Sequence, residues 1–150
     1  MKTKITEDLI FQDLEFSTSE EVLSYLANKL YEKGLVVENY TDAVLAREIE
    51  YPTGLPAKIN VAIPHTDSKY VNETSVVVGI LNKLVQFKSM ENPDNILDIQ
   101  LVIMLAIKDP NDQIDFLQSV ISLIQDERAL EKIIYSHDKH IIKTILEEYL

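Results

Sequence analysis

Two apolar runs do most to limit what this chain can fold into. Ser75–Leu81 is rich in β-branched residues and apolar on both faces, and Asp98–Ile107 holds the longest apolar run of the sequence. A strand with two apolar faces is typical of the centre of a sheet that helices cover on each side. The second run is only about half of the roughly 20 residues that a membrane-spanning helix needs. We therefore expect both runs to be core strands.

Helical signals precede these runs. Thr18 is expected to cap one helix, with Glu21 as its capping-box partner, and Gly34 is expected to end it. A second helix is predicted over residues 41–48. It would place Arg47 near its carboxyl-terminal end, where the helix dipole favours a cation.

Helical periodicity returns after residue 112. The first of the later helices has an apolar stripe that we expect to face the core, formed by Ile114, Leu117, Ile121 and Ile124 and widened by Phe116, Val120 and Leu123. Two shorter helices are expected over residues 128–135 and 139–149. A short strand over residues 84–87 can pair with the strand over residues 75–81 as a hairpin through Asn82 and Lys83. Residues 1–150 thus predict a single-domain α/β sandwich, a mixed sheet flanked by helices on both faces.

Composition and charge narrow the class of protein. The 150 residues suit one domain with a full core, and a hydrophobic share of 46% argues against disorder. The absence of cysteine excludes disulfides and thiolate chemistry. The net charge of −11 argues against nucleic acid and anionic membranes as partners; it either attracts a basic partner protein or serves solubility alone. No signal peptide is expected in Met1–Asp8, which predicts a cytoplasmic protein without membrane insertion.

One histidine follows the end of a predicted strand. In Ile59–Asp67, apolar residues alternate with Asn60 and Ala62 as in a strand with one apolar face. Pro64 lacks an N–H group and cannot continue a ladder, so the strand should end there and leave His65 at its terminus. Functional residues often lie at such ends, held by a rigid scaffold.

Several alternative chemistries are poorly supported. His65 and Asp67 form an H-x-D pair of the kind found in metal hydrolases, but the further ligand clusters such enzymes need are missing. His137 and His140 have metal-ligand spacing, yet a solvated helix start capped by Ser136 or Asp138 explains them better. Neither a G-x-S-x-G nucleophile elbow nor a glycine-rich phosphate loop is present in the sequence.

The neighbours of His65 suit phosphoryl chemistry. A neutral imidazole nitrogen can attack a phosphoryl group, whose transition state needs positioning and stabilisation by cations or N–H groups. Arg47 can supply a bidentate guanidinium and Thr66 a hydroxyl. The second ring nitrogen must be held by an acceptor, such as a carbonyl or carboxylate, to fix the tautomer.

The same residues carry a family resemblance over nearly the whole chain. The sequence resembles the enzyme IIA component of the sugar phosphotransferase system, in its fructose–mannitol superfamily, and within it the galactitol-type branch. The likeness rests on Ala46–Glu48, Pro52–Leu55, Val61–Asp67, Val85–Phe87 with Met90, and Leu105–Pro110.

That resemblance implies both a mechanism and partners. His65 would accept a phosphoryl group from the phosphocarrier HPr, usually on Nε2, and donate it to a cognate IIB component that serves the membrane permease IIC. Arg47 matches the family's active-site arginine, and Thr66 occupies the position beside the histidine. The resemblance implies a phosphotransferase that needs no cofactor or metal and serves the uptake of a sugar or sugar alcohol. A regulatory IIA domain that signals its phosphorylation state by binding other proteins is the alternative.

The sequence also departs from the mannitol and fructose types. Their second histidine, at the start of the helix after the long core strand, aligns with Gln113, which can donate a hydrogen bond to phosphate but cannot hold a titratable proton. Their active-site glutamate just before the A-I-P-H strand has no match, since Lys58 and Ile59 stand there. These differences fit a galactitol-like branch better than a mannitol one.

Overall fold

The computed structural model describes residues 5–150. Residues 1–4, part of the segment in which no signal peptide is expected, lie outside the described residues. Along the chain the elements are the short 3-10 helices η1 (Glu7–Leu9), η2 (Ser68–Tyr70) and η3 (Pro110–Asp112), the strands β1 (Ile10–Leu14), β2 (Gly54–Leu55), β3 (Val61–Ala62), β4 (Ser75–Lys88) and β5 (Ile96–Ala106), and the helices α1 (Ser19–Glu32), α2 (Tyr40–Glu50), α3 (Gln113–Gln125), α4 (Glu127–Tyr135) and α5 (Lys139–Tyr149).

The described strands form one mixed sheet in the order β1-β4-β5-β3-β2. β1 runs parallel to β4 and β3 parallel to β5, whereas β4 pairs antiparallel with β5 and β2 with β3. The two predicted apolar runs are the central strands β4 and β5. This confirms the expected α/β architecture.

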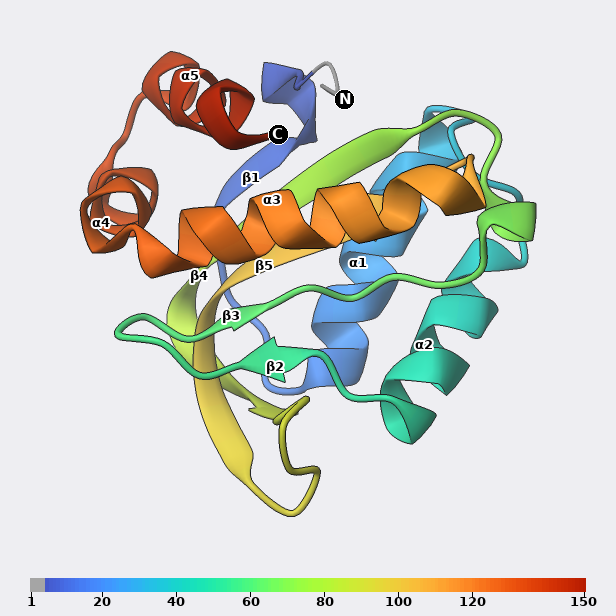
Figure 1. Cartoon of the computed structure of the whole chain (residues 1–150), viewed down its shortest axis with the longest axis horizontal. Coiled ribbons are helices and arrows are strands. Elements are labelled where there is room, and N and C mark those ends of the chain that lie inside the picture. The colour runs from blue at the N-terminus through green and yellow to red at the C-terminus, as the bar shows by residue number, and fades with distance from the viewer. Residues whose placement is uncertain (1–4) are drawn as a thin grey trace.

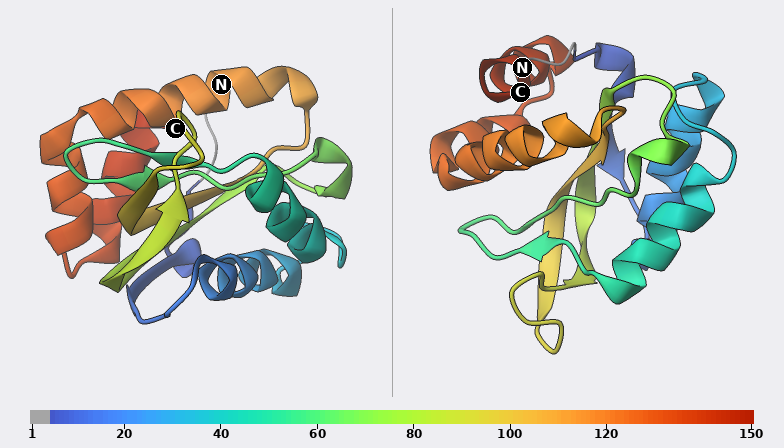
Figure 2. Two further views of the ribbon diagram at one scale, coloured as in Figure 1. Left: turned by 90° about the horizontal axis from the view of Figure 1, so that it is seen from below. Right: turned by 45° about the vertical axis from the view of Figure 1, so that its right-hand side comes forward.

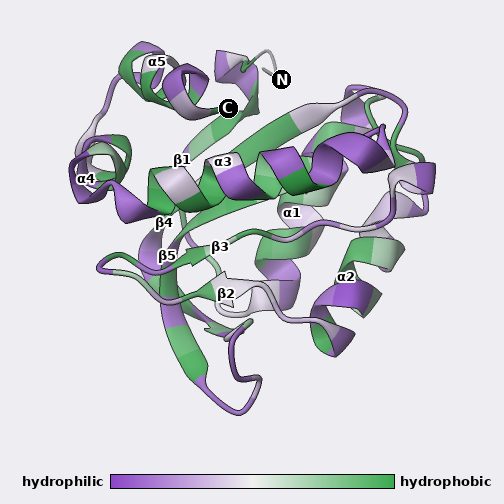
Figure 3. Ribbon diagram, in the orientation of Figure 1, coloured by the Kyte–Doolittle hydropathy of each residue, from purple (hydrophilic) through white to green (hydrophobic). Residues whose placement is uncertain are grey.

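Helices cover both faces of the sheet. In Figure 1, α3 crosses in front of the sheet and α1 lies behind it, and the turned views of Figure 2 show the same layers. One apolar core packs α3, α4 and α5 against the sheet, and a second packs α1 and α2 against its other face. In Figure 3 the helices alternate between hydrophobic and hydrophilic segments, as expected of amphipathic helices that cover a sheet on one side.

The predicted ends of α1 are confirmed. The Thr18 side chain accepts a hydrogen bond from the Glu21 N–H at 3.2 Å, as an N-cap does. At the other end Gly34 has φ +72°, and its N–H reaches the Tyr31 carbonyl at 2.9 Å. The Leu35 N–H bonds to the Leu30 carbonyl at 3.1 Å, which completes a Schellman motif.

The predicted hairpin through Asn82 and Lys83 is wrong. Residues 75–88 form one continuous strand, and its antiparallel partner is β5, with a register irregularity between Ile80 and Val85. Tight two-residue hairpin turns favour Asn-Gly or Asp-Gly, because their central residues need positive φ. Asn-Lys lacks that glycine, and the strand passes through it.

The predicted core stripe of α3 is only partly right. The helix buries the residues proposed as the flank of the stripe, Phe116, Val120 and Leu123, together with Ile124. Ile114 and Ile121, placed in its centre, are 67% and 41% exposed. The helix is therefore rotated toward its bulkiest side chain, since burial of the phenyl ring removes the most apolar surface from water.

No helix among residues 5–150 is long and apolar enough to cross a membrane.

Candidate functional site

His65 follows a short strand whose end is fixed on both sides. β3 covers only Val61 and Ala62, but the pairing continues beyond it: the Ile63 N–H bonds to the Thr53 carbonyl at 3.2 Å, and the Leu105 N–H bonds to the Pro64 carbonyl at 3.0 Å. Pro64 has no N–H to offer, so the ladder stops there as predicted. The backbone just before His65 is thus held between the segment before β2 and the end of β5.

The His65 ring is held in one tautomer. Its Nδ1 lies 2.9 Å from the Ile63 carbonyl oxygen. A carbonyl can only accept a hydrogen bond, so Nδ1 carries the proton and, in the neutral ring, Nε2 carries the lone pair. Among residues 5–150 Nε2 has no hydrogen-bond partner, and the one buried side-chain polar atom without a partner is on Arg47. Nε2 therefore retains contact with solvent although only 7% of the residue is exposed.

Burial keeps this imidazole neutral. Desolvation of the ring lowers the pKa of His65 below its ordinary 6.5, and the nearby positive charge of Arg47 lowers this pKa further; the hydrogen bond to Ile63 opposes both effects. The neutral ring is thus the form present at pH 7. That form is the nucleophilic one.

Arg47 occupies the last turn of α2 with unused donors. Its guanidinium carbon lies 5.2 Å from the centre of the Tyr51 ring, in a cation–π arrangement. The described chain offers it no carboxylate at ion-pair distance, and its buried Nε has no hydrogen-bond partner. Donors left unpaired in this way suit an anionic ligand.

A surface cleft brings Arg47 and Thr66 together. It measures about 260 Å³ and its lining includes Arg47, Tyr51, Thr66, Asp67, Lys69 and Tyr70. Thr66 is 7% exposed, and its hydroxyl makes no hydrogen bond within the part of the chain that the structure describes. The structure thus places two of the predicted residues, Arg47 and Thr66, on one cleft; His65 precedes Thr66 in the chain but is not among the residues that line it.

Gln113 is the first residue of α3 and is half-buried. Figures 1 and 2 place the start of α3 near η2, which follows His65 in the chain. The Gln113 side chain makes no hydrogen bond within residues 5–150 and does not line the cleft of Arg47 and Thr66. Its role as the substitute for a second histidine stays a prediction.

Glu48 was not predicted from the sequence as a residue of the site. One carboxylate oxygen of Glu48 accepts a hydrogen bond from the Thr53 N–H and the other from the Thr53 hydroxyl, each at 2.7 Å. Burial raises the pKa of Glu48 to about 7, against the opposing effects of the Thr53 hydrogen bonds and of Arg47. The available signal was the Arg47-Glu48 pair, followed five residues on by a threonine in the Pro-Gly loop.

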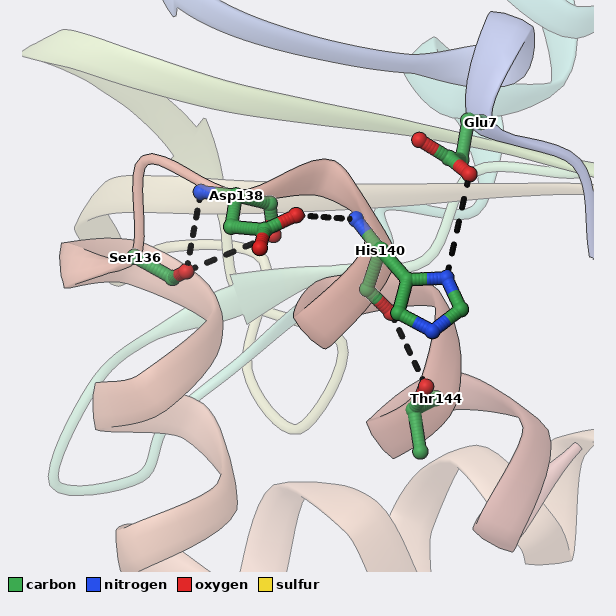
Figure 4. A network of polar contacts seen from close by, with 5 residues as sticks. All are labelled: Glu7, Ser136, Asp138, His140 and Thr144. Carbon is green, nitrogen blue, oxygen red and sulfur yellow. Dashed lines mark hydrogen bonds and ion pairs between the residues drawn. The ribbon is translucent and has the colours of Figure 1, made fainter.

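The two other histidines form the solvated helix start that was expected. Figure 4 shows Asp138 accepting the His140 N–H, at 2.9 Å, as the cap of α5. The His140 ring is exposed, with Nδ1 3.9 Å from a Glu7 carboxylate oxygen. Residues 5–150 contain no cluster of three or more His, Cys, Asp or Glu side chains able to hold a metal.

Comparison with known proteins identifies the family of this chain. The family model described as "Phosphoenolpyruvate-dependent sugar phosphotransferase system, EIIA 2" matches residues 3–149. The chain belongs to the EIIA 2 family. It is therefore a phosphotransferase component, and the family resemblance seen in the sequence is confirmed.

Similarities to individual proteins agree with this assignment. The galactitol-specific EIIA component of Escherichia coli K12 is 27% identical over 146 residues, which cover 97% of this chain and 93% of that protein. The crystal structure of IIA mannitol from Escherichia coli superposes with a TM-score of 0.81 at 26% identity, covering 96% of this chain and 99% of that one. A complex of Escherichia coli enzyme IIAMTL with phosphorylated enzyme IIBMTL gives the same TM-score at 25% identity, covering 95% of this chain and 96% of that one.

Proposed function

We propose that residues 1–150 act as one phosphocarrier unit that accepts a phosphoryl group from HPr on Nε2 of His65 and passes it to a cognate IIB component. The observation that carries the proposal is the hydrogen bond from Nδ1 of His65 to the Ile63 carbonyl. It places the proton on Nδ1 and leaves the lone pair on Nε2, which faces no protein partner within residues 5–150.

Both steps of the transfer, acceptance from HPr and donation to IIB, are displacements at phosphorus. The Nε2 lone pair forms the new N–P bond while the bond from phosphorus to the donor atom breaks, and its electron pair returns to the donor. In the second step an acceptor on IIB attacks phosphorus and the N–P electron pair returns to Nε2. Nδ1 keeps its proton throughout, so the ring needs no separate base.

Arg47 and Thr66 are proposed to stabilise the phosphoryl group in transit. The guanidinium has a free donor and lines the same cleft as Thr66, the residue after His65, and fixed donors of this kind stabilise charge that develops on phosphoryl oxygens. The Thr66 hydroxyl is a second donor from the residue next to His65. We propose Gln113 as a further hydrogen-bond donor from the start of α3.

The partners follow from the family and from the charge. A chain of net charge −11 suits a basic docking face on HPr. The IIB partner is supported by the similarity to an enzyme IIA that is bound to its phosphorylated IIB. The likeness to a galactitol-specific component supports a galactitol-like substrate for the system's membrane permease IIC, with this chain acting in the cytoplasm.

Incubation with phosphoenolpyruvate, enzyme I and HPr tests the proposal. The wild-type protein and a His140→Ala control should each incorporate acid-labile phosphate, whereas His65→Ala should incorporate none while keeping its fold by circular dichroism. Equal incorporation in His65→Ala would refute the assignment. Addition of a galactitol-type IIB should then discharge the phosphorylated wild-type protein. A protein that takes phosphate from HPr but passes it to no IIB would instead match a regulatory IIA domain.

A further inference from the structure

A continuous hydrogen-bonded path runs from α2 to the His65 ring. The Glu48 carboxylate binds both the N–H and the hydroxyl of Thr53. The Thr53 carbonyl accepts the Ile63 N–H at 3.2 Å, and the Ile63 carbonyl accepts the proton on Nδ1 of His65 at 2.9 Å. We propose that Glu48 is a positioning residue, which sets the orientation and tautomer of His65 through Thr53 and Ile63.

The geometry separates this role from direct catalysis. Glu48 makes no hydrogen bond or ion pair with His65, and its side-chain bonds within the described chain go to Thr53 alone. Thr53 is 2% exposed, in a loop that has no regular structure until β2 begins at Gly54. Two bonds from a single carboxylate fix both the backbone and the side chain of this residue, so they determine where its carbonyl points.

The orientation of the Thr53 carbonyl matters because few other hydrogen bonds hold this part of the backbone. β3 is only two residues long, so the bond from Ile63 to Thr53 extends a very short ladder. If Thr53 shifts, Ile63 loses the anchor on its N–H, and the next peptide unit, which carries the Ile63 carbonyl, is held less firmly. The Nδ1 proton then loses a well-placed acceptor, and the ring can take the tautomer with the proton on Nε2, which has no lone pair to attack phosphorus.

The proposal rests on the proposed function, since it assumes Nε2 to be the nucleophile. It also predicts a property of the unmodified protein that no partner is needed to measure. Nitrogen-15 NMR of the His65 ring reports directly which nitrogen carries the proton.

Four variants separate the effect of the hydrogen-bonded path from the effects of charge and of folding. Glu48→Ala removes both bonds to Thr53. Glu48→Gln removes the charge but keeps one acceptor for the Thr53 N–H and one donor for its hydroxyl. Thr53→Val keeps the N–H bond and loses the hydroxyl bond. Asp42→Ala, the matched control, removes an exposed acid from the same helix away from the path.

The readouts are the His65 tautomer and the rate of phosphorylation at saturating HPr. In the wild type, Glu48→Gln and Asp42→Ala we expect one Nδ1–H tautomer and similar rates. Glu48→Ala should show mixed tautomers and a rate roughly 10- to 100-fold lower, with the HPr concentration for half-maximal rate little changed. Thr53→Val should fall between them, which keeps the test valid if Glu48→Ala does not fold.

The outcomes separate the two proposals. A wild-type tautomer and rate in folded Glu48→Ala, or in Thr53→Val if Glu48→Ala does not fold, would overturn the positioning role and leave the phosphocarrier function intact. A loss in Glu48→Gln as large as in Glu48→Ala would also overturn it, because charge rather than hydrogen bonding would then be responsible. If the wild type takes no phosphate from HPr, the proposed function fails, and the tautomer measurement still decides for or against the path.

Discussion

The hydroxyl of Tyr40 donates a buried hydrogen bond to the carbonyl of Leu105, at 3.0 Å. Tyr40 is the first residue of α2, and the N–H of the same Leu105 binds the carbonyl of Pro64, directly before His65. Arg47 and Glu48 come from the other end of α2. One helix therefore contacts, from its two ends, the two segments that hold the backbone before His65: Tyr40 contacts the end of β5, and Glu48 contacts the loop at Thr53.

The Tyr40→Phe substitution tests the first of these contacts. It removes the hydroxyl and leaves the buried Leu105 carbonyl without this donor, so we expect the free energy of unfolding to fall by about 1–3 kcal/mol. Urea denaturation followed by circular dichroism measures the loss. Tyr135→Phe, at a side chain that is 69% exposed, is the matched control and should change little. Equal stability of the two variants would contradict the structural role.

Arg47→Ala should lower the rate of transfer from HPr by about 10²–10³-fold, because fixed donors to the phosphoryl oxygens are lost. Stability should change by less than about 1 kcal/mol, since the described chain provides no ion pair for this side chain to lose. Arg47→Lys should recover only part of the rate, because an ammonium cannot bind two oxygens in a fork. Rapid-quench measurement of phosphate incorporation gives the rates. The control is Arg128→Ala, at an exposed arginine on α4, which should leave the rate unchanged. An unchanged rate in Arg47→Ala would show that Arg47 does not belong to the site.

The rate of phosphorylation should depend on pH through His65. Burial lowers the pKa of this ring below 6.5, so the neutral, nucleophilic form persists as the pH falls through that value. We expect the rate to stay level from pH 8 to 6.5 and to decline only at lower pH, and the ring signals in NMR to titrate over the same lower range. Because Arg47 contributes to the lowered pKa, Arg47→Ala should move this titration to higher pH. A midpoint above 6.5 in the wild type would contradict the role of burial.

Glu48 should make stability fall as the pH rises from about 4.5 toward 7. Its pKa in the folded protein is about 7, above its ordinary value of 4.5, so the folded protein holds a proton that the unfolded chain releases in this range. The stability that Glu48 contributes through its raised pKa is therefore fully present below pH 4.5 and is lost as the pH passes 7. Urea denaturation at a series of pH values measures it as the difference in unfolding free energy between the wild type and Glu48→Gln. A difference that does not change between pH 4.5 and 7 would exclude the buried acid.

The sequence predicted the layers of the fold and the position of His65 after the end of a strand, because both depend on local patterns. Apolar runs on both faces of a strand and a proline before His65 can be read without knowing what packs around them. The face that α3 turns toward the sheet could not be predicted from local patterns alone. Its stripe is broad enough to place either Ile114 or Phe116 toward the sheet, and packing against β4 and β5 decides for Phe116.

The partners around the histidine were less accessible to prediction. That an acceptor must hold one ring nitrogen followed from chemistry, but the acceptor is a backbone carbonyl, for which no side chain gives a signal. The role of Glu48 was not predicted for a related reason. Its partner Thr53 lies in a loop, and only the three-dimensional path through Ile63 connects it to His65.

The acceptor that holds the Nδ1 proton of His65 belongs to the main chain, and this has a consequence for how the protein tolerates change. Every amino acid at position 63 supplies the same oxygen, so random substitution there alters packing without removing the contact. Only variation that displaces the peptide itself removes this acceptor, so sequence drift that leaves His65 in place should be least tolerated where that backbone is anchored.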